Sequence, residues 1–165
     1  PNPHPYDSIV LMVQKEVAER LYAQPGTKAF NGLSVRVQYL AECELICTVP
    51  ASAFKPAPKV ESAVVRLRPR PFPQQATAPK LLNTLVKQGF GQKRKMLRNN
   101  LKSLVDRDQL TDSFAAMAID PQVRAEQLSV ENWVELSNRV AAQGIAAQDA
   151  ASQPPQDGSA RPAGD

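Results

Sequence analysis

The sequence predicts an α/β region followed by a small all-α domain and a disordered tail. A short continuous apolar run at residues 8–13 is typical of a strand buried on both faces, and residues 15–23 follow it with helical spacing. A proline-rich stretch without apolar periodicity then indicates a linker. The parts that we expect are an α/β region at 1–70, a linker at 71–79, a helical domain at 80–143 and a tail at 144–165.

Two further strands are expected in the α/β region. Residues 42–49 and 60–67 alternate in character, and the prolines between them predict a stiff, extended loop. Residues 33–40 fit either a strand or a helix lying on a sheet. Because a strand buried on both faces needs a neighbour on each side, the region is expected to belong to a larger sheet.

Beyond residue 79 the apolar residues recur at helical spacing. Four such stripes predict four packed helices, and they begin near Leu81, Met96, Phe114 and Trp133. From Gly144 onward Ala, Gln, Pro, Ser, Gly and Asp dominate. Such a composition buries too little apolar surface to fold, so we expect that tail to be disordered.

Composition excludes several classes of protein. A hydrophobic content of 42% supports a folded core, and no apolar run is long enough to cross a membrane. Cys43 and Cys47 are expected on one face of a strand about 13 Å apart, too far for a disulfide and too few to hold zinc. We therefore expect two ordinary thiols, no metal site and a cytoplasmic location.

Positive charge is concentrated in one short segment. Residues 80–107 hold eight of the 20 Lys and Arg residues but only one of the 16 acidic residues. Such a run suits a polyanion such as RNA, although a solvated helix face is the alternative. The basic residues that we expect on one short helix, facing RNA, are Lys93, Arg94, Lys95, Arg98 and Lys102. Asn99 and Asn100 are expected to add polar contacts to sugars or bases.

Four segments, in order, resemble the small-subunit ribosomal RNA adenine dimethyltransferase family. Residues 54–67 follow F-x-P-x-P-K-V-x-S-A-V-V-x-L, and residues 90–101 are similar to F-x-Q-R-R-K-x-L-R-N-x-L. Residues 14–21 and the R-A-E-x-L-S pattern at 124–129 complete the set. Erythromycin-resistance RNA methyltransferases share the first pattern, whereas the basic segment favours the ribosome-biogenesis branch.

The resemblance implies the C-terminal part of a Rossmann-like methyltransferase sheet. It also implies methyl transfer from S-adenosylmethionine to the exocyclic amines of two neighbouring adenines in small-subunit rRNA. The expected partner is the immature ribosomal small subunit, bound by a monomer with no membrane contact. Folded rRNA is expected to be recognised more by its shape than by its sequence.

The resemblance also places the target base. It implies that Phe54 stacks on the flipped adenine, with Pro56 and Pro58 stiffening the loop. Lys55 and Lys59 are expected to meet RNA phosphates, whereas the neighbouring Glu61 and Ser62 are expected to hold the loop. The alternative role for Phe54 is a hydrophobic plug between loop and sheet.

Other signatures of a methyltransferase are missing. The glycines are scattered and no glycine-rich turn follows the first strand, nor is the family's Asn-Leu-Pro-Tyr motif present. We therefore expect a longer parent enzyme, no catalytic residue in this chain, and no binding of S-adenosylmethionine by it alone. The alternatives are a non-catalytic RNA-binding module and a DNA-binding transcription factor of the related mitochondrial type.

Overall fold

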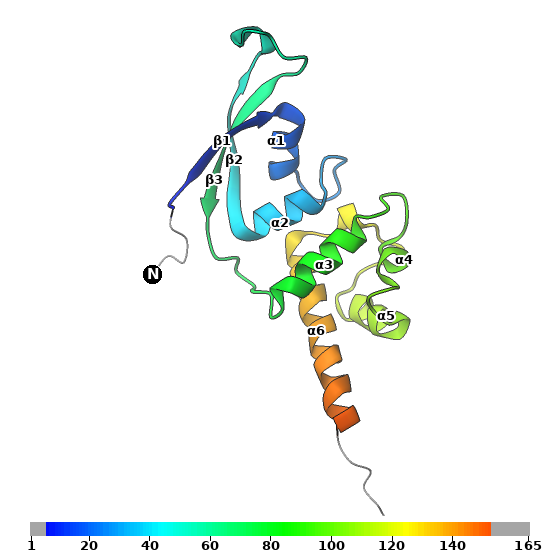
Figure 1. The fold of residues 1–165 in the computed structure, drawn as a ribbon. Coiled ribbons are helices and arrows are strands. Elements are labelled where there is room, and N and C mark those ends of the chain that lie inside the picture. The colour runs from blue at the N-terminus through cyan, green and yellow to red at the C-terminus, as the bar shows by residue number, and fades with distance from the viewer. Residues whose placement is uncertain (1–5, 153–165) are drawn as a thin grey trace, which may run out of the picture.

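The computed structural model describes residues 6–152, and side-chain surroundings as far as residue 144. Three strands form an antiparallel sheet in the order β1-β3-β2 (Figure 1). Their bounds are β1 Ile9–Gln14, β2 Ala41–Val49 and β3 Ser62–Pro69. The predicted α/β class, with a sheet followed by helices, is confirmed.

Helix α1 (Lys15–Tyr22) follows β1 directly and covers one face of the sheet. Its apolar side buries Ala18 and Leu21 against Ala63 and Val65 of β3. These four small or branched side chains allow the helix to lie close to the pleated surface. The predicted amphipathic helix after the first strand is therefore confirmed.

The segment with two possible readings forms helix α2 (Gly32–Leu40). Asn31 caps it, because its side-chain oxygen accepts hydrogen bonds from the N–H groups of Leu33 at 2.8 Å and Ser34 at 3.4 Å. The Ser34 hydroxyl accepts in turn from the Asn31 N–H at 3.0 Å. This reciprocal cap decides in favour of a helix.

The continuous apolar run of β1 predicted a strand buried on both faces, and this prediction is wrong. The strand lies at an edge of the sheet and pairs with β3, and Val10 and Met12 are 60% and 57% exposed. Within residues 6–152 no strand pairs with its other edge. The described part of the chain thus lacks the second neighbour that such a run requires.

The two cysteines do not share a face of β2. Leu45 lies opposite Val65, whereas Cys47 lies opposite Val64, so one extra residue forms a bulge between Leu45 and Cys47. The bulge turns Cys47 to the face opposite Cys43. Both thiols are free, and burial raises the pKa of the half-buried Cys43.

The remaining helices form a group at one end of the sheet (Figure 1). They are α3 Pro79–Gly89, α4 Leu97–Leu101, α5 Arg107–Ala116 and α6 Val130–Ser152, with short 3-10 turns η1 Ala51–Ala53 and η2 Ala125–Gln127. We expected a disordered tail from Gly144 onward. This expectation is wrong as far as Ser152, because α6 continues through it. Residues 153–165 lie outside the described residues.

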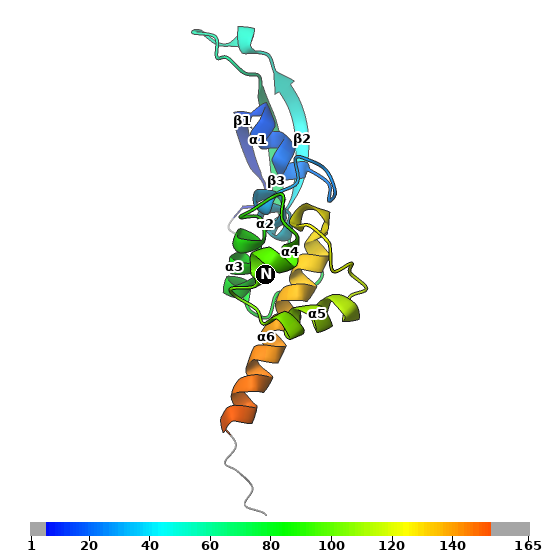
Figure 2. The ribbon, with the colours of Figure 1, turned by 90° about the vertical axis from the view of Figure 1, so that its right-hand side faces the viewer.

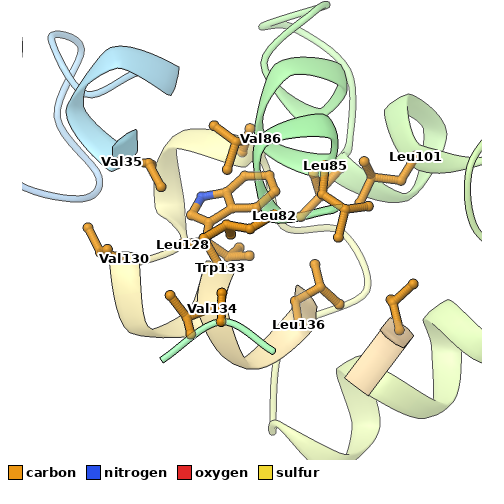
Figure 3. Packing of buried hydrophobic residues seen from close by; sticks show 14 of the residues in the cluster. Val35, Leu82, Leu85, Val86, Leu101, Leu128, Val130, Trp133, Val134 and Leu136 are labelled. Carbon is orange, nitrogen blue, oxygen red and sulfur yellow. The ribbon is translucent and has the colours of Figure 1, made fainter. Parts of the chain in front are cut away.

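The main core centres on Trp133 of α6, which is fully buried (Figure 3). Around it lie Leu85 and Val86 of α3, together with Val35 of the α/β region. The stretch that we expected as a linker contributes Phe72 and Ala76 to this core. One continuous core therefore joins the helices to the α/β region.

The end of α3 is fitted closely to Trp133. A Cβ atom added to Gly89 would lie 2.4 Å from the Trp133 ring and 3.0 Å from a Leu97 methyl. The next residue, Phe90, packs on the same indole, with ring centroids 5.6 Å apart. Only glycine therefore fits here without moving the tryptophan.

We predict that Gly89→Ala lowers the free energy of unfolding by about 1–3 kcal/mol, because the new methyl overlaps the buried indole. The matched control is Gly144→Ala in α6, where an added Cβ meets nothing within 4 Å. The control should instead stabilise the chain by about 0.5–1 kcal/mol, the usual helical gain. Urea unfolding of both variants decides the matter, and equal shifts of the same sign would contradict the tight fit.

Candidate functional site

The loop between β2 and β3 projects beyond the sheet, at the end away from helices α3 to α6 (Figures 1 and 2). Its first turn is η1, closed by hydrogen bonds from the Ala53 N–H to Pro50 O at 3.0 Å and from the Phe54 N–H to Ala51 O at 3.2 Å. The Lys55–Pro56 peptide bond is cis. Backbone bonds and prolines thus fix the place of Phe54 in this loop.

Phe54 differs from its neighbours in exposure. Its ring is half-buried, whereas Lys55, Pro56, Pro58 and Lys59 are exposed. Among the described residues Phe54 belongs to neither hydrophobic core and is not packed against either of them. The ring is therefore partly exposed on this loop, and its exposed part could stack on a flat ligand.

The far end of the loop is attached to the start of α1. The Lys15 N–H donates to Glu61 O at 3.0 Å, and its ammonium group lies 2.7 Å from the Glu61 carboxylate. This hydrogen bond and the charge of Glu61 raise the pKa of Lys15. The structure thus shows Glu61 bonded within the protein, in agreement with its expected holding role.

The spacing of the basic residues predicted that they lie on one helix, and this prediction is wrong. Residues 91–96 form turns, so Lys93, Arg94 and Lys95 precede α4, with only Arg98 inside it and Lys102 at its C-cap. In a helix the Leu97 N–H would donate to the carbonyl four residues earlier. It donates instead to Val123 O, at 2.8 Å. A tertiary hydrogen bond therefore takes the place of the local helical one.

We expected Asn100 to contact a ligand, but it is not available for this. Its side chain instead holds residues 91–96, which we call the basic loop. Its side chain is only 7% exposed, and its amide donates to Gly89 O at 2.6 Å and to Gln92 O at 3.1 Å. The Lys95 N–H closes the following turn on Gln92 O at 3.0 Å. The neighbouring Asn99 is exposed. One buried amide thus shapes the segment that carries the cations.

The cations of this segment have no acidic partner among the described residues. The ion pairs among the described residues involve other basic residues: Lys15, Arg20, Arg66, Arg68 and Arg139. The side chains of Lys93, Arg94, Lys95, Arg98 and Lys102 are all exposed. Their charge is therefore free to meet a polyanion.

Arg107 was missed by the sequence reasoning. It is the first residue of α5 and lines a pocket together with Arg98 and Lys102 of the preceding helix. Its place in the basic run was visible, but the turn that brings α5 beside α4 was not. The cationic surface thus continues from α4 onto α5.

The described residues do not fit S-adenosylmethionine. Such a site needs a glycine-rich turn between a strand and a helix, whereas β1 runs directly into α1. The turn that holds Gly26, at φ +82°, joins two helices.

Within residues 6–152 no group of three or more His, Cys, Asp or Glu side chains is placed to hold a metal ion. The helices of that part are also too short or too polar to span a bilayer.

The chain is similar to known proteins of one family. The profile of the family described as "Ribosomal RNA adenine dimethylase" matches residues 2–142. The chain is 67% identical over 141 residues to the ribosomal RNA small subunit methyltransferase A of Nostoc punctiforme, covering 86% of this chain and 49% of the relative. The corresponding protein of Acaryochloris marina is 67% identical over 135 residues, covering 82% and 50%. The chain thus spans about half the length of these curated relatives.

Two solved structures share the fold. A dimethyladenosine transferase from Plasmodium falciparum superposes with a TM-score of 0.71 at 23% identity, covering 86% of this chain and 60% of that one. The 23S rRNA methyltransferase ErmE gives a TM-score of 0.59 at 22% identity, covering 82% and 55%.

We predict that Asn100→Ala lowers the free energy of unfolding by about 1–3 kcal/mol, because two loop carbonyls lose their buried donor. Asn99→Ala is the matched control on the same helix, since its side chain is exposed. The control should stay within about 0.5 kcal/mol of the parent chain. Chemical denaturation measures both values. A free energy of unfolding that Asn100→Ala leaves unchanged would show that the amide does not hold the loop.

Proposed function

Because the chain belongs to the ribosomal RNA adenine dimethylase family, we propose that it recognises small-subunit rRNA and receives the target adenine for a methyltransferase. In this proposal the enzyme dimethylates the exocyclic amines of two adjacent adenines during assembly of the small subunit. The other half of a longer protein holds S-adenosylmethionine, the methyl donor. The 165 residues alone are inactive, because the described part does not fit the cofactor.

The observation that carries the proposal is the unpaired cationic surface around α4. RNA binding releases counterions from the phosphates, so exposed cations without carboxylate partners contribute most. The buried amide of Asn100 holds the basic loop in shape before RNA arrives. A preformed surface loses little conformational entropy on binding. Such a surface suits folded RNA, which proteins recognise largely by shape and backbone.

Phe54, Pro56 and Pro58 form the proposed target-base pocket. A base must leave its stack before its exocyclic amine can react, and an aromatic ring then offers a new stacking surface. Phe54 is partly exposed and lies outside both cores. Lys55 and Lys59 are exposed on the same loop, where they meet phosphates beside the flipped nucleotide. The chain's own residues thus bind and orient the base.

The test of RNA recognition pairs two double variants of this chain. Lys93→Gln with Lys95→Gln should weaken binding to a structured small-subunit rRNA fragment about tenfold at moderate salt and lower the salt slope by about 2. Lys28→Gln with Arg70→Gln removes the same charge from exposed positions outside the basic run at residues 80–107. This control should change affinity much less. Equal losses in both pairs, or tighter binding of duplex DNA, would contradict the proposal.

A second test addresses the target base in the longer protein. Phe54→Ala should lower the turnover number by about tenfold or more while rRNA affinity falls far less, because stacking on one base is worth about 1–3 kcal/mol. Phe54→Tyr keeps the ring and should retain most of the activity. Methyl incorporation and rRNA binding are measured side by side. Parallel losses of turnover and affinity would indicate a hydrophobic plug instead.

A further inference from the structure

A pocket of about 560 Å³ lies between α4 and α5, outside the loop that carries Phe54. Its apolar lining comes from Val105, Leu110, Phe114 and Pro121. Its cations are Arg98, Lys102 and Arg107. Val105, Leu110 and Phe114 are almost wholly buried, whereas Pro121 and the cations are exposed. The pocket therefore has an apolar floor and a positively charged rim.

The lining of this pocket contains no acidic residue. Four aspartates, Asp106, Asp108, Asp112 and Asp120, are sequence neighbours of lining residues but do not themselves line the pocket. Asp106 caps α5 and accepts a hydrogen bond from the Asp108 N–H at 2.9 Å. Arg98, Lys102 and Arg107 have no ion-pair partner in the part of the chain that the structure describes. No ion pair among the described residues therefore engages the rim cations, and they complement an anion.

The pocket adjoins the basic loop through shared residues. Asn99 and Lys102 line it and also line a second hollow of about 240 Å³, which reaches Gly91 and Gln92. Lys102 therefore stands between the two hollows. A chain of phosphates that follows the basic loop is led past Lys102 to the mouth of the larger pocket.

We propose that this pocket binds one unstacked base of single-stranded RNA, with the flanking phosphates on Arg98, Lys102 and Arg107. Its volume lies within the range of about 300–1,000 Å³ typical of small-ligand sites. Apolar surface accepts a base, and arginine guanidinium planes stack on bases that have left a helix. An acidic peptide shares the charge but not the flat apolar group that the floor fits. The inference rests on the proposed RNA-binding function and adds a second base contact, apart from Phe54.

The test fills the pocket from its side. Thr111 lines it and is exposed on α5, and its hydroxyl donates to Arg107 O at 2.8 Å. Thr84 is its match on α3: it is also exposed, donates to Lys80 O at 2.9 Å and is not part of this pocket. Thr111→Phe and Thr84→Phe therefore make the same chemical change in two similar helical settings.

Binding is measured with a labelled eight-nucleotide single-stranded RNA and with an abasic ribose-phosphate strand of equal length. Thr111→Phe should weaken binding of the RNA about fivefold or more and leave the abasic strand nearly unchanged, as expected for loss of one base contact. Thr84→Phe should change neither. Arg107→Gln, which leaves the floor intact, should weaken both strands. Circular dichroism confirms that each variant is folded.

Three results would overturn the pocket: no effect of Thr111→Phe, an equal effect on both strands, or equal competition by a polyglutamate peptide. These failures are separable from failure of the proposed function. If structured rRNA still depends on Lys93 and Lys95 while Thr111→Phe is silent, only the pocket is lost. If the short RNA responds to Thr111→Phe but structured rRNA does not bind, only the proposed function is lost.

Discussion

The contact between Trp133 and Gly89 is the constraint on which the rest of the structure depends. The indole occupies the place where any side chain at residue 89 would lie, so only glycine fits at the end of α3. Phe90 then packs on the indole, and Phe30 of the α/β region packs on Phe90 at 6.3 Å between ring centroids. This row of aromatic rings joins the helices to the region beside the sheet. Loss of the fit at Gly89 would therefore disturb both halves of the molecule.

The same contact determines where the cations are displayed. Since α3 ends at Gly89, residues 91–96 must cross to the start of α4 without a helical hydrogen-bond ladder. The missing partners come from two other residues. The Asn100 amide donates to the Gly89 and Gln92 carbonyls, and the Val123 carbonyl accepts from the Leu97 N–H. Buried polar groups are costly without partners, so these bonds favour one loop conformation. Packing in the core thus places the cationic surface.

Local patterns in the sequence were enough to predict α1, the proline-stiffened loop that holds Phe54, and helices α3, α4 and α6. The helix expected to begin near Phe114 was misplaced, because α5 spans Arg107–Ala116 and ends two residues after Phe114. The error at Lys93–Lys95 has a tertiary cause: their spacing suits a helix, but the Leu97 N–H finds Val123 from a distant segment. The bulge before Cys47 adds one residue to a strand that otherwise alternates regularly, and no residue type marks it. Arg107 joined the site only through the turn between α4 and α5. Interactions between near neighbours were therefore predictable, whereas those made by chain reversals were not.

The bulge in β2 also separates the chemistry of the two thiols. Cys47 is exposed near the end of the strand that leads into the Phe54 loop, whereas Cys43 is half-buried with a raised pKa. A thiol reacts as its thiolate, so burial makes Cys43 the slower nucleophile at neutral pH. A maleimide dye should then attach selectively to Cys47 without any engineered cysteine. The native chain thus carries its own attachment point for a fluorophore that reports on movements of the neighbouring loop.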